Sequence, residues 1–356
     1  MSPSRPVRAT VLGAGSWGTA LAVLACDQAD TLLWARNPAV AQEINGQHTN
    51  HGYLPDAQLP AVLRATDNIQ DAVSHACAGE HPGLIILGVP VAGLQALCER
   101  VASLLANSKA PQPAIVWTCK GFHHETGQLP HELARAAFAA FPDIGLGVLS
   151  GPSFAREVAA GLPVALTVAT ADERCSQLVL SALHGRTARI YTSQDVVGVE
   201  VGGALKNVMA IACGISDGLA LGTNARAALI TRGLAEMQRL GTALGGLPET
   251  FAGLTGLGDL VLTATGALSR NRQVGLAIGQ GQSLDDILAS GVTAEGVRCT
   301  RSALALGRRH GIELPITAAV CRILFEGLSP QEAVIGLLSR DARPESAIHP
   351  TDPSTP

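Results

Sequence analysis

Short aliphatic and β-branched runs alternate with helix-like stretches through the first half of the chain. The runs that predict strands are 7–12, 31–34, 84–87, 114–118, 148–150 and 165–168. A stretch with helical spacing, 15–25, follows the first of them. Strands that alternate with helices are typical of right-handed βαβ units. The pattern therefore predicts an α/β fold with a parallel sheet.

The pattern changes after about residue 195, where long Ala, Leu and Gly stretches replace the strand-like runs. Apolar residues recur there at helical spacing, for example at Val208, Ile211, Ala212 and Ile215. We therefore expect an α/β domain over 1–192 and an all-helical domain over 193–340. The remaining segment, 341–356, is rich in Pro, Ser and Thr, and we expect it to be a disordered tail.

Composition and charge narrow the class of protein. Hydrophobic residues make up 47% of the 356 positions and charged residues 15%, which predicts a large core. The net charge of −4 argues against a partner that is a nucleic acid. Every apolar run is broken by Gly, Pro or charge before about 18 residues, so we expect no membrane span. The polar N-terminus and the absence of CxxC pairs among the eight cysteines favour a cytoplasmic location.

A glycine motif follows the first predicted strand. Residues 13–18 read Gly-Ala-Gly-Ser-Trp-Gly and open the first predicted helix. Gly13, Gly15 and Gly18 have the GxGxxG spacing that allows a tight turn and a close approach of the backbone to a pyrophosphate. An ordinary glycine-rich turn is the structural alternative, but the position between strand and helix favours dinucleotide binding.

The end of the second predicted strand bears on the choice of dinucleotide. A carboxylate there would bind the ribose 2′-hydroxyl of NAD. The sequence instead continues Trp34-Ala35-Arg36-Asn37-Pro38, without an acid. Arg36 suits a 2′-phosphate, which favours NADP, or the use of both cofactors, unless it is a surface arginine that closes a loop.

Two lysines are candidates for chemistry. Lys120 follows the predicted strand 114–118 and lies at the carboxyl edge of the sheet, where ligands bind in open α/β folds. Lys206 lies in a long run with few charges, so its pKa should be lowered by desolvation. A snorkelling helix lysine and a simple loop lysine are the alternatives. The turn at 151–155, Gly-Pro-Ser-Phe-Ala, follows another strand and is either a nicotinamide contact or a plain loop.

The helical half contributes further polar groups. Asp259 and Thr263 are four residues apart, on one helical face. Ser269, Arg270 and Asn271 suit an anion such as a phosphate, although such a segment is often only a solvated loop. The cluster His123-His124-Glu125 lacks a partner at metal spacing, so we read it as exposed and expect no metal site.

Taken together, these motifs resemble bacterial glycerol-3-phosphate dehydrogenase (NAD(P)+). The resemblance runs from about residue 7 to 340 and is carried, in order, by GAGSWGTALA, WTCKGF, SGPSFA, VGGALKNV, GLGDLVLT and SRNR. It implies a Rossmann-like doubly wound parallel sheet followed by an all-helical C-terminal domain, which also forms a homodimer. The implied reaction interconverts dihydroxyacetone phosphate and sn-glycerol 3-phosphate, with NADP or NAD as cofactor, and supplies glycerophospholipid synthesis.

The resemblance also implies roles for residues that match the family's motifs. The catalytic positions are Lys206, as proton acceptor or donor, with Lys120 and Asp259. The substrate positions are Lys120, Gly151, Ser153, Lys206, Asp259, Ser269, Arg270 and Asn271. The cofactor positions are Gly13, Gly15, Ser16, Trp17, Gly18, Arg36, Lys120, Ala155, Arg270, Ala294 and Glu295. The family often has Val where this chain has Ala294.

Two other functions share parts of this pattern. A dehydrogenase for a 3-hydroxy acid or ketopantoate would share the first domain and a helical lysine, but it would need no phosphate site at Ser269-Arg270-Asn271. A dinucleotide-sensing protein without catalysis would not require both Lys120 and Lys206. The sequence therefore favours glycerol-3-phosphate dehydrogenase over both.

Overall fold

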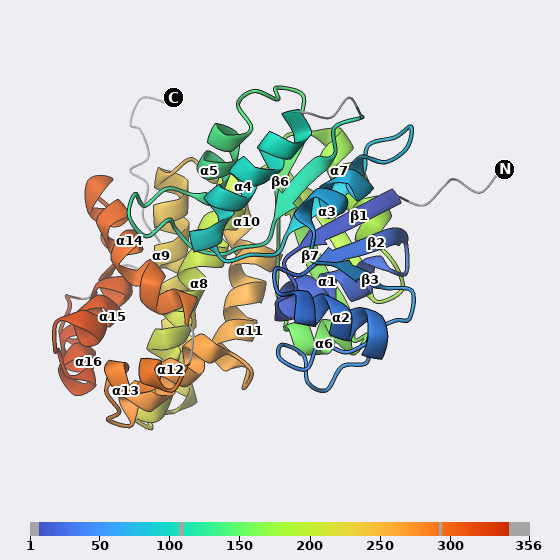
Figure 1. The fold of residues 1–356 in the computed structure, drawn as a ribbon. Coiled ribbons are helices and arrows are strands. Elements are labelled where there is room, and N and C mark those ends of the chain that lie inside the picture. Colours follow the sequence, from blue (N-terminus) through green and yellow to red (C-terminus); the bar gives the residue numbers. More distant parts are fainter. Residues whose placement is uncertain (1–6, 107–109, 292–293, 342–356) are drawn as a thin grey trace, which may run out of the picture.

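The first part of the chain forms one twisted sheet with helices on both faces (Figure 1). The computed structural model describes residues 7–106, 110–291 and 294–341. The strands are β1 (Val7–Leu12), β2 (Ala29–Trp34), β3 (Arg64–Thr66), β4 (Leu84–Leu87), β5 (Ala114–Trp117), β6 (Leu146–Ser150), β7 (Val164–Ala169) and β8 (Ala188–Ser193). The helices of this part are α1 (Ser16–Ala25), α2 (Pro38–Gln47), α3 (Ile69–Cys77), α4 (Val91–Ala106), α5 (Pro130–Ala137), α6 (Ala155–Ala159) and α7 (Glu173–Leu183).

The strand order is β3-β2-β1-β4-β5-β6-β7-β8, and every pair is parallel except β6 with β7. The predicted α/β fold with a doubly wound sheet is thus confirmed, with one antiparallel pair that the sequence pattern did not indicate. β3 and β8 were also not predicted. β3 has only three residues, and β8 exposes residues such as Arg189 and Tyr191, so neither has the apolar run of a buried strand.

The sheet is buried because neighbouring strand residues face opposite layers of helices. In β4, Ile86 packs in the same cluster as Leu21 of α1, whereas Ile85 packs in the same cluster as Leu94 of α4. Strands that are buried on both faces read as continuous apolar runs, which is why β4 and β5 were recognisable.

The second part is helical and lies beside the carboxyl edge of the sheet (Figure 1). Its helices are α8 (Val196–Gly218), α9 (Gly222–Ala243), α10 (Pro248–Ala252), the π-helical turn η1 (Leu254–Gly258), α11 (Asp259–Thr265), α12 (Arg270–Gly279), α13 (Leu284–Ala289), α14 (Glu295–Arg309), α15 (Pro315–Phe325) and α16 (Pro330–Leu338). Helix α8 is central, since α9, α11, α12 and α14 all pack against it. The all-helical second part is confirmed.

Helix α8 has the length and composition of a membrane span, but its surroundings are protein. Of its most apolar 18-residue window, 89% is buried inside the molecule. It is therefore the core helix of the second part, and it is the one such helix in the described residues. The expected disordered tail, apart from Asp341, lies outside the described residues.

Candidate active site

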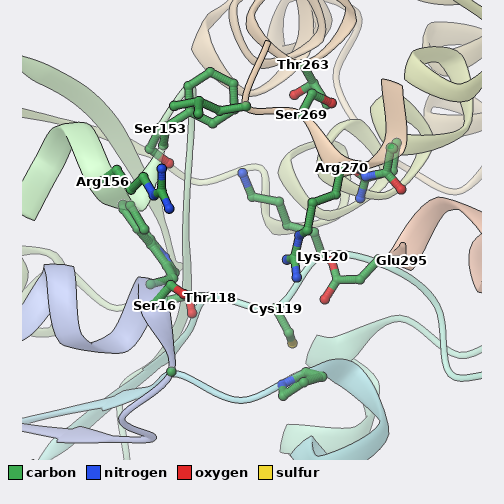
Figure 2. Close-up of a pocket in the computed structure, with 18 of the residues that line it drawn as sticks. Ser16, Thr118, Cys119, Lys120, Ser153, Arg156, Thr263, Ser269, Arg270 and Glu295 are labelled. Carbon is green, nitrogen blue, oxygen red and sulfur yellow. Dashed lines mark hydrogen bonds between the residues drawn. The ribbon is translucent and has the colours of Figure 1, made fainter. Parts of the chain in front are cut away.

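A cleft of about 690 Å³ runs between the carboxyl edge of the sheet and the helical part. Its walls come from the β1–α1 turn, the segment after β5, the β6–α6 turn, and helices α8, α11, α12 and α14. Figure 2 shows Lys120, Arg270 and Glu295 on one side and Ser16, Ser153 and Arg156 on the other. Segments more than 100 residues apart in sequence thus meet at one site.

Both candidate lysines bind one buried carboxylate. Lys206 Nζ donates to Asp259 Oδ1 at 2.5 Å, and Lys120 Nζ donates to Asp259 Oδ2 at 2.5 Å. Lys206 Nζ also donates to Thr263 Oγ1 at 3.0 Å, and Lys120 Nζ to the carbonyl of Gly151 at 3.1 Å. The side chain of Lys206 is 8% exposed, so the snorkelling alternative is wrong.

The electrostatics of this cluster lower the pKa of Lys206 to about 8. Burial is the main cause, and the charge of Lys120 lowers the pKa further, whereas Asp259 partly opposes both effects. Burial alone would raise the pKa of Asp259, but the two ammonium groups together lower it. Asp259 therefore remains ionised between two lysines, one of which titrates near neutral pH.

The N-terminus of α12 faces the same cleft. Ser269 caps this helix, since its hydroxyl accepts a hydrogen bond from the Arg272 amide at 3.2 Å. Arg270, the first residue of the helix, is exposed and lines the cleft. Arg272 points the other way, where its Nε donates to Asp217 of α8 at 2.9 Å. A guanidinium at a helix N-terminus suits an anion, because both contribute positive potential.

A chain of amides joins the helices around the cleft. Asn271 Nδ2 donates to Asn207 Oδ1 at 2.9 Å, and Asn271 Oδ1 accepts from the Gly296 amide at 3.0 Å. These contacts tie α12 to α8, one residue from Lys206, and to α14, one residue from Glu295. The positions of the predicted substrate and cofactor residues are therefore interdependent.

The glycine turn leaves no room for side chains at two of its positions. Gly13 has φ +128°, and a Cβ atom there would lie 2.5 Å from the carbonyl oxygen of Gly88. A Cβ at Gly18 would lie 1.9 Å from the carbonyl oxygen of Gly13. The turn therefore lies in close contact with the residue that follows β4 and with the first turn of α1, and the amino end of α1 lines the cleft. This arrangement fits the diphosphate of a dinucleotide.

The cofactor-side residues divide into two groups. Gly15, Ser16, Trp17, Ala155 and Glu295 line the cleft, where burial raises the pKa of Glu295. Gly13, Gly18 and Ala294 do not line it, and neither do the substrate-side residues Gly151 and Asp259; all of these except Gly13 are buried. Arg36 follows β2, is exposed, and does not line this cleft.

Residues of the cleft that the sequence reasoning missed include Tyr53, Arg156 and Asn207. Asn207 and Arg156 directly follow predicted site residues, so adjacency was the available signal. A buried group behind the site was also missed: Glu200 of α8 accepts from Trp117 Nε1 at 2.8 Å and contacts His131 Nδ1 at 2.6 Å. No local motif indicates that network. Among the described residues, no group of His, Cys, Asp and Glu has metal-site geometry.

Comparison with known proteins decides the family. The model of the NAD-dependent glycerol-3-phosphate dehydrogenase N-terminus matches residues 8–176, and that of the C-terminus matches 195–335. The chain is 40% identical to glycerol-3-phosphate dehydrogenase from Coxiella burnetii, with 94% of this chain and 99% of that one covered and a TM-score of 0.85. This chain belongs to the NAD-dependent glycerol-3-phosphate dehydrogenase family.

Two eukaryotic structures extend this likeness. Glycerol-3-phosphate dehydrogenase from Saccharomyces cerevisiae is 25% identical, with 92% and 98% of the two chains covered and a TM-score of 0.77. The Plasmodium falciparum enzyme, at 21% identity, 96% and 97% coverage and a TM-score of 0.82, shares the fold. The resemblance inferred from the motifs is confirmed. Members of the NAD-dependent glycerol-3-phosphate dehydrogenase family are oxidoreductases that use a nicotinamide dinucleotide, and the glycine turn has the shape for that cofactor.

Proposed function

We propose that this chain reduces dihydroxyacetone phosphate to sn-glycerol 3-phosphate, and catalyses the reverse reaction, with Lys206 as the proton carrier. The product would supply glycerophospholipid synthesis. The observation that carries the proposal is the lysine pair on Asp259, which shares one cleft with the glycine turn and the N-terminus of α12.

The nicotinamide, when bound, supplies or accepts the hydride at the substrate's C2 carbon. During reduction, negative charge develops on the carbonyl oxygen, and the ammonium of Lys206 stabilises it and donates the proton. During oxidation, neutral Lys206 accepts the proton of the hydroxyl group. A pKa of about 8 makes both forms accessible near neutral pH. Asp259 orients the amine, and Lys120 adds positive charge beside the substrate.

The phosphate of the substrate is assigned to the N-terminus of α12, where Ser269, Arg270 and Asn271 lie. Gly151 and Ser153, in the β6–α6 turn, would border the substrate from the sheet side. Holding the phosphate at one end fixes the ketone relative to Lys206 and the nicotinamide. A substrate that lacks the phosphate should therefore react poorly.

The cofactor is assigned to the turn formed by Gly13, Gly15, Ser16, Trp17 and Gly18, with further contacts from Lys120, Ala155, Arg270, Ala294 and Glu295. We favour NADPH over NADH because the residue that follows β2 in the ribose-binding position is not an acid, and Arg36 lies there instead. Arg36 is exposed, as a residue that binds a 2′-phosphate at the rim of a site would be. The preference rests on that charge alone.

We further propose two domains, 1–192 and 193–340, and a homodimer formed through the helical one. The eight cysteines are all free, which supports a reducing, cytoplasmic location. Exposed apolar side chains on α16, Ile335 at 66% and Leu338 at 80%, support an interface in the helical part.

The test is absorbance at 340 nm with dihydroxyacetone phosphate and either NADH or NADPH. We expect oxidation of both cofactors, with a lower KM for NADPH, and little activity with dihydroxyacetone itself. A 3-oxo acid, which is the ketone form of a 3-hydroxy acid, and ketopantoate serve as alternative substrates. Activity with either of these, and none with dihydroxyacetone phosphate, would overturn the proposal.

A further inference from the structure

Arg156 places a cation at the dinucleotide end of the cleft. The cationic side chains that line the cleft, among the described residues, are Lys120, Arg156, Lys206 and Arg270. Lys120 and Lys206 bind Asp259, and Arg270 begins α12. Arg156 belongs to α6 on the opposite wall, and Figure 2 shows its guanidinium between Ser16 and Ser153. Its position separates it from the group of cations at the substrate end.

The amino end of α1 lies beside Arg156. Helix α6 packs against α1, and the first residues of α1, Ser16 and Trp17, line the cleft together with Arg156. Gly15 caps α1 without a side-chain hydrogen bond, and no acidic residue occupies its first turn. Free amide groups and a guanidinium therefore face the same part of the cleft, and both favour an anion.

The present partner of Arg156 is weak. Its Nη1 lies 3.8 Å from Oδ2 of Asp56, and the two side chains are 56% and 79% exposed. Exposed ion pairs at this distance contribute little free energy. A bound anion that offers two oxygens to the guanidinium would compete successfully with Asp56.

We propose that Arg156 binds the diphosphate bridge of the nicotinamide dinucleotide, opposite the glycine turn. The inference deepens the cofactor assignment and rests on the dinucleotide cofactor, but not on Lys206 or on the preference for NADPH. It assigns Arg156 to binding: the residue reaches neither the carboxylate of Asp259 nor the α12 end of the cleft. Since NADH and NADPH carry the same diphosphate, Arg156 should stabilise both equally.

The test is the Kd of NADH and of NADPH for Arg156→Ala, measured by nicotinamide fluorescence. Loss of one charge-assisted contact at a half-exposed site should raise both Kd values about tenfold. The KM for dihydroxyacetone phosphate, at saturating cofactor, should stay within about twofold, a change too small to represent a lost contact. Arg156→Lys should recover part of the affinity, because it keeps the charge but loses the paired donors.

Two variants control for indirect effects. Arg322 is 57% exposed and pairs with Glu326 at 3.9 Å, so Arg322→Ala removes a matched arginine outside the cleft and should change nothing. Asp56→Asn removes the ion pair but keeps Arg156. If the pair merely holds the loop at Asp56 to α6, Asp56→Asn would weaken binding as much as Arg156→Ala, and that result would overturn the proposal.

Three other results with Arg156→Ala would also overturn the proposal that Arg156 binds the diphosphate. A loss restricted to NADPH would assign Arg156 to the 2′-phosphate, and a raised KM for dihydroxyacetone phosphate alone would assign it to the substrate. Unchanged constants would leave Arg156 without a ligand. Competition by ADP and AMP supplies an independent measure: Arg156→Ala should weaken ADP more than AMP, since only ADP has a diphosphate. Because these readouts are binding constants, they stand even if Lys206 is not the proton carrier.

Discussion

Lys206 combines burial, a carboxylate partner and a neighbouring cation at one nitrogen atom. Its amine donates to Asp259 and Thr263, and Lys120, which binds the same carboxylate, places a second positive charge nearby. Burial and Lys120 favour the neutral amine, whereas Asp259 favours the charged form. The residue that the sequence singled out for its apolar surroundings thus has the pKa that its proposed role requires.

Replacing Lys206 tests that role directly. Lys206→Ala should lower kcat by at least about 100-fold, as expected for a lost acid–base group, with the Kd of NADPH nearly unchanged. Lys206→Arg should not restore activity, because a guanidinium does not release its proton near neutral pH. Steady-state kinetics and a fluorescence titration measure the two effects. A variant that kept more than about a third of kcat would show that the proton carrier is elsewhere, and Lys120 would be the candidate.

The pH profile should report the same group. Reduction requires the ammonium form, so its rate should fall as pH rises through about 8, whereas oxidation requires the amine and should rise there. In Asp259→Asn the group that raises the pKa of Lys206 is lost. The fall of the reduction rate and the rise of the oxidation rate should therefore both occur at lower pH. Rates measured in both directions across this range would decide. If the two pH profiles were the same in the wild type and in Asp259→Asn, the assignment of the pH dependence to Lys206 and Asp259 would be wrong.

Arg36 bears on the choice between cofactors. Arg36→Asp should raise the KM for NADPH, since it replaces a cation by an anion, with a loss of about 1.5 kcal/mol, the low end for charged contacts because the side chain is exposed. The KM for NADH should change less. Equal KM values for NADPH in the wild type and the variant would make Arg36 a loop residue only.

At the scale of elements, it is the N-terminal turn of α12, and not the rest of the helix, that contributes to the proposed phosphate site. Its capping serine, its first arginine and Asn271 all lie in the first turn, and Arg272 anchors that turn to Asp217 at 2.7 Å. The segment that a sequence pattern could describe as a solvated loop is therefore the capped and anchored start of a helix. Backbone amides and side chains of this turn can therefore act together on one phosphate.

Removing the guanidinium of Arg270 should weaken the binding of the substrate's phosphate without removing the groups proposed for proton transfer. Arg270→Ala should raise the KM for dihydroxyacetone phosphate at least about tenfold, because the dianion loses a charge-assisted partner. Arg309→Ala, at the exposed C-terminal end of α14, should leave it unchanged. Kinetics with dihydroxyacetone complete the test, since efficient turnover of that compound by the wild type would show that no phosphate site operates.

At the scale of the whole molecule, the cleft exists only where the two parts meet. The sheet contributes Lys120 and the glycine turn, and the helical part contributes Lys206, Asp259 and Arg270. Because neither part holds the site alone, their relative position has to be stable. The Glu200 network stabilises it, since α8 binds Trp117 of β5 and His131 of α5 through one buried carboxylate.

The proposed homodimer is the prediction at this scale. The particle should have twice the chain mass of 36.5 kDa in sedimentation equilibrium, because apolar side chains such as Leu338 remain exposed on a single chain. A concentration series measures the association. A single-chain mass across the series would refute the dimer without affecting the assignment of the active site.

The sequence determined the features that depend on neighbouring residues. Glycine spacing at 13–18, the apolar strands β4 and β5, and the sparse charge around Lys206 are local properties, and each appears in the structure where it was predicted. Short or exposed elements such as β3 and β8 were missed, since they bury too little apolar surface to leave a pattern. The antiparallel pairing of β6 with β7 has no local signal either.

Tertiary structure alone decided which polar groups meet. Asp259 is 53 residues from Lys206 and 139 from Lys120, yet its two oxygens contact both amines. The same holds for the amide chain at Asn271 and for Arg156 beside the glycine turn. A sequence motif determines which residue is present and the conformation of its local backbone. The distance in space between two motifs depends on how the sheet packs against α8. The lowered pKa of Lys206 depends on that packing, because burial and charge act only over a few ångströms.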